Sequence, residues 1–109
     1  MPYYDLDKVR EAAKRKDIEY RGWKVRLDIA NLSYELSDVA DCISNLTLNH
    51  FHKTKDYGNG QIDDVYKCVY ENTTDEDTKF DELYIKLSLK NNWLSIDLGS
   101  FHLWIEERG

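Results

Sequence analysis

The chain has 109 residues, 41% of them hydrophobic and 33% charged, which is ordinary for a soluble protein and predicts a single domain over residues 1–109. No apolar run approaches the roughly 18 residues that a membrane-spanning helix needs, so we expect no contact with a membrane. The formal net charge of −6 at pH 7 disfavours indiscriminate binding to nucleic acid. Any contact with RNA must therefore come from a local basic patch.

The N-terminus carries neither the basic nor the apolar region of a signal peptide, which predicts a cytoplasmic protein. In that reducing compartment Cys42 and Cys68 are expected to be small buried hydrophobes. A disulfide between them depends on distance and stays open.

Two helices are predicted in the first half of the chain. Asp5 is a good N-cap, and apolar residues follow it at helical spacing through about Lys16. Ser37 is expected to cap the main helix, whose apolar stripe ends near Leu46 and packs on the sheet. The segment between them, residues 18–32, fits a short strand bent at Gly22 and a following helical turn.

Thr47 is expected to cap a short helical piece that carries His52 and Lys53. Beyond it the pattern changes to strands. Residues 61–71 are rich in Val, Tyr and Ile, and residues 83–90 and 94–98 alternate apolar with polar side chains.

The strands are joined by three predicted connections: a loop at residues 56–60, a long polar turn at residues 72–81 and a tight hairpin turn at Asn91-Asn92. Helices followed by an antiparallel meander predict an α+β fold, with the N-terminal helices packed on one face of a small antiparallel sheet. The other face is free to meet solvent or a ligand.

On that free face, two or three lysines, one carboxylate and one phenol are expected to form a cleft: Lys67, Lys86, Asp63 and Tyr84, with Lys53 approaching from the preceding short helix. Lysines stabilise charge that develops on a phosphate, and a carboxylate or phenol can accept a 2′-hydroxyl proton while another acid protonates the leaving oxygen. This set fits phosphodiester chemistry without a metal or other cofactor. The alternative is a solvated strand face with ordinary Lys–Asp pairs.

Histidines and tryptophans are expected to be structural. No carboxylate or cysteine cluster completes a metal site with His50 and His52. The aromatic segment 100–104 is predicted to pack as an extra strand or cover, and His102 could donate a proton if that segment folds over the cleft. The tryptophans Trp23, Trp93 and Trp104 are more often core anchors than base-stacking platforms.

Several segments resemble the MqsR family of bacterial toxins, the motility quorum-sensing regulators. The similarity runs through Leu32–Lys53, which ends in Phe51-His52-Lys53, then Asp64-Val65-Tyr66-Lys67, Leu83-Tyr84-Ile85-Lys86-Leu87 and Leu94-Ser95-Ile96; the opening Tyr4-Asp5-Leu6-Asp7-Lys8-Val9 resembles the family's first helix. The resemblance implies a RelE-like fold and a type II toxin–antitoxin pair. It also implies a metal-independent endoribonuclease that cuts mRNA at short sequences, arrests growth and is silenced by a cognate antitoxin.

By this resemblance Lys53 matches the family's catalytic lysine and Tyr84 its catalytic tyrosine, while Lys67 matches a basic position. Asp63 stands where the family has a catalytic glutamine. A carboxylate there could act as a base, but it would also repel the phosphate. The predicted site comprises the catalytic residues Lys53, Asp63 and Tyr84 and the RNA-binding residues Lys67, Lys86 and His52.

The change at Asp63, the acidic segment 71–82 and the tail beyond Gly99 depart from the family pattern. They leave an alternative open: a non-catalytic protein-binding module on the same scaffold, for example one encoded on a mobile element. The expected partners are mRNA and an antitoxin protein, and an oligomer with itself or with the antitoxin is left open.

Overall fold

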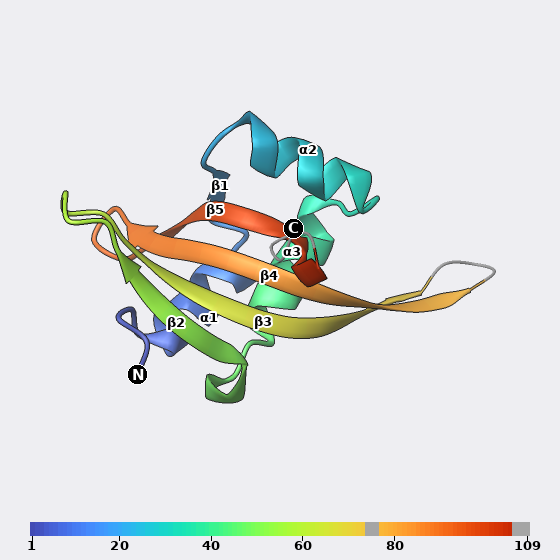
Figure 1. Cartoon of the computed structure of the whole chain (residues 1–109), viewed down its shortest axis with the longest axis horizontal. Coiled ribbons are helices and arrows are strands. Elements are labelled where there is room, and N and C mark those ends of the chain that lie inside the picture. Colours follow the sequence, from blue (N-terminus) through green and yellow to red (C-terminus); the bar gives the residue numbers. More distant parts are fainter. Residues whose placement is uncertain (74–76, 106–109) are drawn as a thin grey trace.

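The computed structural model describes residues 1–73 and 77–105. Its elements, in chain order, are α1 (Leu6–Lys14), β1 (Ile18–Tyr20), α2 (Trp23–Asn31), α3 (Leu36–Ser44), the 3₁₀ helix η1 (Leu48–His50), β2 (Phe51–Asp56), β3 (Ile62–Thr73), β4 (Thr78–Lys90) and β5 (Ser95–Leu103) (Figure 1). Three helices and one sheet confirm the predicted α+β class. Within the described residues, no helix is both long and apolar enough to cross a membrane.

The five strands form one sheet in the order β1-β5-β4-β3-β2. Strands β2 to β5 pair antiparallel with their neighbours, as the alternating pattern predicted. The prediction of a purely antiparallel sheet is nevertheless wrong at one edge, where β1 pairs parallel to β5 with Ile18 opposite Ile96. A three-residue strand with its partner almost eighty positions away leaves no local pattern to read.

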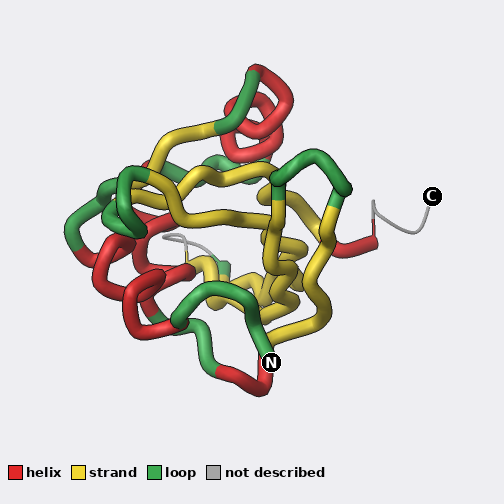
Figure 2. The backbone as a smooth tube through the Cα atoms, turned by 90° about the vertical axis from the view of Figure 1, so that its left-hand side faces the viewer, coloured by secondary structure: helices red, strands yellow, loops and turns green. Residues whose placement is uncertain are grey.

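Helices α1 and α3 lie together behind the sheet in Figure 1. Seen from the end (Figure 2), they occupy one side of the strands, and α2 stands apart at the top, beside the β1 edge. The core between helices and sheet contains the largest fully buried apolar side chains: Val9, Val39, Ile43, Leu46, Tyr66, Leu83, Ile85, Leu87, Ile96, Leu98 and Phe101. The sheet therefore has one face that is committed to packing.

The ends of the first and third helices test the capping predictions. Asp5 is the N-cap of α1, and its carboxylate accepts the Asp7 N–H at 2.9 Å, as expected. The helix ends at Lys14, slightly earlier than predicted, and Lys16 follows with a φ of 60°. The prediction of Ser37 as a cap is wrong, because α3 begins at Leu36 after the N-cap Glu35.

The segment that looked ambiguous forms both β1 and the complete helix α2. The sequence predicted a single helical turn there, because the segment has a weak apolar stripe: Val25 and Ile29 are buried, whereas Trp23 is 78% exposed and Leu27 is also exposed. Trp23 is thus not the core anchor that was predicted. It projects from the first turn of α2.

Two of the predicted turns are confirmed. In the 56–60 loop Gly58 and Gly60 have positive φ, and the Tyr57 N–H donates to the Gln61 carbonyl at 3.1 Å. Asn91 and Asn92 also have positive φ, as a hairpin turn requires, but the turn continues through residues 93 and 94. Leu94, predicted to lie on the apolar face of a strand, is therefore 59% exposed.

The predicted polar turn at residues 72–81 is largely strand instead. β3 continues to Thr73 and β4 begins at Thr78, and these two residues are register partners. The resulting hairpin extends past the rest of the molecule (Figure 1). Residues 74–76, part of that predicted turn, and 106–109, part of the tail, lie outside the described residues.

The predicted short helix that carries Lys53 is also corrected. Its helical part stops at His50, whose Nδ1 accepts the Thr47 N–H at 2.9 Å, and β2 begins at Phe51. Lys53 therefore lies on an edge strand. The predicted extra strand or cover at residues 100–104 is corrected: residues 100–103 continue β5, which runs unbroken from Ser95 to Leu103.

Candidate active site on the basic face of the sheet

The face of the sheet turned away from α1 and α3 collects the predicted lysines. Side chains alternate between the two faces of a strand, and register partners share a face. Lys67 of β3 is opposite Tyr84 of β4, which is opposite His102 of β5. Leu83, Ile85 and Leu87 of β4 face the helices, so Tyr84, which lies between them in the sequence, faces away together with its two partners.

A second row runs beside the first. Lys53 of β2 is opposite Val65 of β3, which is opposite Lys86 of β4. Val65 and Lys67 are two residues apart on one strand, so both rows share one face. We call this surface the basic face and define it by Lys53, Lys67, Lys86, Tyr84 and His102. The register brings together five side chains that the sequence analysis named, and their catalytic roles remain predictions.

A change of register on β5 makes the first row possible. Lys86 is opposite Ser100, but the next residue of β4, Leu87, is opposite Leu98, so Gly99 is an extra residue in β5. A β-bulge of this kind interrupts the alternation of side chains along its strand. As a result Ile96 and Phe101 both enter the core, and His102 turns to the basic face.

His52 occupies a similar irregularity on β2. Phe51 is opposite Tyr66 and Lys53 is opposite Val65, so His52 is the extra residue. Partial desolvation, together with the charges of Lys67, Lys53 and Lys55, lowers the pKa of His52 below its usual 6.5. The imidazole is therefore mainly uncharged at neutral pH, which suits a proton acceptor better than the RNA-binding role that was predicted for His52.

Tyr84 differs from its prediction. Its position on the free strand face indicated an accessible phenol, but only 3% of the residue is exposed. Its ring stacks on that of His102, with centroids 5.2 Å apart and planes 12° from parallel. Among the residues that the structure describes, the Tyr84 hydroxyl has no hydrogen-bond partner.

His102 is held in one orientation beside that phenol. Its Nδ1 lies 2.9 Å from the carbonyl oxygen of Leu103. Because a carbonyl can only accept, Nδ1 must carry the proton, and in the neutral ring Nε2 is then the basic nitrogen. His102 thus reaches the basic face through the bulge in β5, within the plane of the sheet, and not by folding of the segment over the cleft.

Asp63 is on the same face but is not a free carboxylate. It is fully buried, and its two oxygens accept from Nη1 and Nη2 of Arg21 at 2.9 and 2.7 Å. Burial tends to raise the pKa of this carboxyl, but Arg21 and then the Gln61 amide outweigh burial and hold it below its ordinary value. A carboxylate so strongly stabilised in its ionised form is a weak base, which corrects the expected role of Asp63.

Arg21 is the residue that sequence reasoning missed. Besides Asp63 it binds Asp97 through Nε at 3.0 Å, and Nη2 lies 3.4 Å from the Ser88 hydroxyl. The hydrogen bonds with Asp63, and to a lesser degree the interaction with Asp97, raise the pKa of the Arg21 guanidinium further, against the opposite effect of burial. A side chain at Gly99 would overlap the guanidinium, so the bulge glycine also makes room for Arg21. The signal in the sequence was two aspartates, Asp63 and Asp97, on predicted strands without an assigned cation.

Two aromatic rings border the lysines. The amine of Lys67 lies 4.1 Å from the ring centroid of Trp104, and that of Lys86 lies 5.8 Å from the ring centroid of Tyr57. Both distances are within the range of a cation–π interaction. Trp104 is therefore part of the basic face and not of the core, whereas Trp93 does pack against the core.

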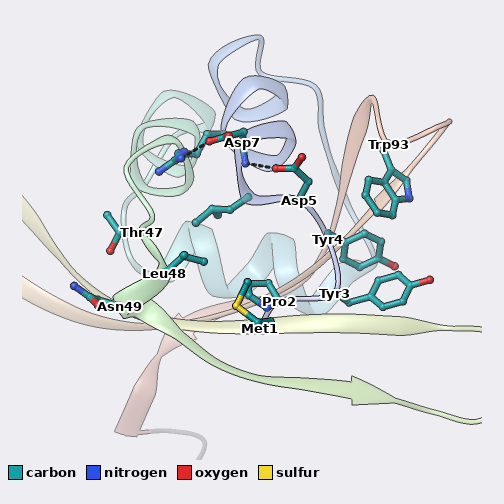
Figure 3. Close-up of a pocket in the computed structure, with 12 residues that line it drawn as sticks. Met1, Pro2, Tyr3, Tyr4, Asp5, Asp7, Thr47, Leu48, Asn49 and Trp93 are labelled. Atoms are coloured by element: carbon teal, nitrogen blue, oxygen red, sulfur yellow. Dashed lines mark hydrogen bonds and ion pairs between the residues drawn. The ribbon is translucent and has the colours of Figure 1, made fainter.

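A cavity of about 780 Å³ lies at the N-terminus, away from the basic face (Figure 3). Figure 3 shows Tyr3, Tyr4 and Trp93 together at one end of it and Thr47 at the other. Its acidic groups are already engaged: Asp5 caps α1 and Asp7 pairs with Arg10. The basic face, by contrast, carries the groups that can move protons and stabilise charge. Across the described residues, no three His, Cys, Asp or Glu side chains are grouped to hold a metal ion.

Comparison with known families agrees with the resemblance noted in the sequence. The family model described as "motility quorum-sensing regulator, toxin of MqsA" matches residues 1–102, which include both rows of the basic face. A search of curated proteins found no match. Membership implies a toxin of a toxin–antitoxin system whose partner is an MqsA antitoxin. The chain thus belongs to the family of motility quorum-sensing regulators that are toxins of MqsA.

Proposed function

We propose that this toxin is an endoribonuclease that cuts mRNA on the basic face and thereby arrests growth. The observation that carries the proposal is the placement of Lys53, Lys67 and Lys86 on one face with Tyr84. Three amines can stabilise the charge that develops on a phosphate during cleavage, and the phenol can transfer a proton.

The residues divide the chemistry among them. The uncharged His52 accepts the 2′-hydroxyl proton of the substrate, and the 2′-oxygen then bonds to phosphorus. As the bond from phosphorus to the 5′-oxygen breaks, Tyr84 donates a proton to that leaving oxygen. The products are a 2′,3′-cyclic phosphate and a 5′-hydroxyl end. Asp63 has no part in the proton transfer and instead fixes Arg21 beneath the site.

His52 and Tyr84 are on β2 and β4, so β3 separates them. With neighbouring strands about 4.8 Å apart, their backbones are roughly 10 Å apart, which leaves room for a phosphodiester between the two side chains. The Tyr84 hydroxyl is covered in the free protein, so RNA must move a neighbouring side chain. Lys67, the register partner of Tyr84, is the candidate, because a phosphate competes with the Trp104 ring for its amine.

Cleavage of a mixed-sequence RNA in the presence of a metal chelator tests the proposal. We expect Lys53→Ala and Tyr84→Phe each to lower kcat by roughly a hundredfold or more, the usual contribution of a positioned acid–base or charge-stabilising group. Lys8→Ala, an exposed lysine of α1, is the matched control and should cleave normally. Equal cleavage by all four proteins, or none by the unmodified protein, would refute the ribonuclease.

A non-catalytic binding module is the second candidate. It is favoured by the projecting β3–β4 hairpin, where Val69 and Phe80 are large apolar side chains left exposed. Under this alternative the protein alone does not arrest growth when its expression is induced, and Val69→Ser with Phe80→Ser weakens capture of a protein partner. Growth arrest that depends on Tyr84 rejects it.

A further inference from the structure

We propose that Trp104 and Tyr57 are stacking sites for two bases of single-stranded RNA. Trp104 lies beside Lys67 and Tyr57 lies beside Lys86, two lysines of the basic face. This inference rests on the proposed function, since it names how the same face would hold its substrate. It also reverses the expectation that Trp104 is only a structural anchor.

The first site is at the C-terminal end of β5. Trp104 follows Leu103, the last residue of that strand, and its ring is only partly buried. Beside it is a small cavity of about 150 Å³ whose lining includes Trp104, Lys67 and Val69. The ring therefore borders an open space and a cation at once, which is the pair of features that a nucleotide needs for its base and its phosphate.

The second site is in the loop between β2 and β3. Tyr57 is 45% exposed, and the positive-φ residues Gly58 and Gly60 turn the chain directly after it. Tyr57 adjoins Lys86, whereas Trp104 adjoins Lys67. Lys67 and Lys86 are diagonal neighbours on adjacent strands, roughly 7–8 Å apart at the backbone, so the two aromatic sites belong to one continuous surface.

The repeated pairing of a ring with an amine favours a single-stranded nucleic acid over other anions. A free phosphate or an acidic peptide uses the amine but leaves the ring without a partner. Bases in a duplex already stack on one another, whereas unpaired bases are available to aromatic side chains. Each such stack tolerates any base, because every base has a π-face.

Binding of a short 2′-O-methyl RNA, which lacks the attacking hydroxyl and cannot be cut by the proposed mechanism, isolates recognition from cleavage. We expect Trp104→Ala and Tyr57→Ala each to raise Kd by about tenfold or more, since 1.4 kcal/mol corresponds to a factor of ten. Trp104→Phe and Tyr57→Phe should keep most of the affinity because they keep a ring. Trp23→Ala, which removes an exposed tryptophan on α2, is the control and should change nothing.

A strand of the same length without bases separates stacking from charge. We expect Trp104→Ala and Tyr57→Ala to bind this abasic strand like the unmodified protein, and we expect Lys67→Ala to weaken binding to both the RNA and the abasic strand. If Trp104→Ala weakened binding to both strands equally, or had no effect on binding to either, the proposal would be overturned. Loss of binding to an acidic protein partner with RNA affinity unchanged would also overturn it and assign the rings to a protein interface.

The outcomes distinguish this inference from the function on which it rests. Cleavage that needs Lys53 and Tyr84 but ignores both aromatic rings removes the stacking sites and keeps the ribonuclease. Base-dependent binding without any cleavage supports the stacking sites and removes the ribonuclease.

Discussion

At the scale of single residues, the charge state of His52 is set by its neighbours. Its cationic form is disfavoured first by partial desolvation and then by three nearby amines, of which Lys67 has the largest effect. Removing a positive charge makes the cation easier to form. We therefore expect Lys67→Met to raise the pKa of His52, measured by NMR titration of the imidazole.

If His52 accepts the proton in catalysis, the acid limb of kcat/KM should move to higher pH in the same variant, because a base must be unprotonated to act. Lys55→Met is the graded control, since this amine has the smallest effect of the three, and Lys8→Met should leave the titration unchanged. A shifted NMR titration with an unshifted rate profile would remove His52 from the mechanism and assign the proton to another group.

The two cysteines form a second residue-scale feature. Both are buried, and the Sγ atoms of Cys42 on α3 and Cys68 on β3 are 3.7 Å apart. The hydrogen bond with Cys68, together with burial, raises the pKa of the Cys42 thiol, and the thiolate is the reactive form. Because both cysteines are buried, we expect both thiols to resist an alkylating reagent in the folded protein and to react quickly in urea, as followed by mass spectrometry. Rapid labelling of the folded protein would contradict this burial.

At the scale of elements, Arg21 connects the end of β1 to three other strands through Asp63, Ser88 and Asp97. Removing the guanidinium leaves the buried Asp63 charge without its partner, a change that typically costs 3–5 kcal/mol. The Arg21 side chain is 30% exposed, so water can partly solvate the charge that remains. We therefore expect Arg21→Met to lower the free energy of unfolding by about 3 kcal/mol, the lower end of that range. Urea denaturation measures this loss.

The paired variant tests whether charge is the cause. The double variant Arg21→Met with Asp63→Asn should lose less free energy of unfolding than Arg21→Met alone. Arg26, whose guanidinium lies over the ring of Tyr20, provides the control: Arg26→Met should lose under about 1 kcal/mol. The pKa of Asp63 is lowered in the folded protein, so its contribution to stability is present above about pH 4 and falls as the pH drops below it. Equal losses in the single and paired variants would show that packing, not the ion pair, is what Arg21 supplies.

The elements also show how far a local pattern reaches. Strict alternation over residues 83–90 correctly predicted that part of β4 and its helix-facing side, because a period of two is a property of the strand itself. The two β-bulges, at His52 and Gly99, were not predicted, because a bulge is defined by the partner strand. The parallel pairing of β1 was missed for the same reason. α2 was underestimated because so few of its apolar residues face inward.

For the candidate site the same distinction holds. The common face of Lys67, Lys86 and Tyr84 follows from alternation along two predicted strands, so it could be predicted. Lys53 joins that face from β2, a strand that the sequence pattern did not predict. The burial of Tyr84 and the ion pair of Asp63 could not be predicted. Each depends on a residue far away in the sequence, His102 for Tyr84 and Arg21 for Asp63, that comes into contact only in the folded chain.

At the scale of the whole molecule, an overall charge of −6 coexists with a face on which amines gather. The net charge repels a polyanion at long range, so affinity for RNA must come from the few amines that touch phosphates. Each phosphate contact contributes about −0.7 to the slope of log K against log salt for a single strand, so three lysines predict a slope of roughly −2.

Measuring Kd for the uncleavable RNA across a salt series gives this slope. Lys53→Ala, Lys67→Ala and Lys86→Ala should each reduce its magnitude by about 0.7, whereas Lys8→Ala should not. A slope near zero, or one that Lys8→Ala changes as much as Lys67→Ala does, would mean that RNA does not bind on the basic face.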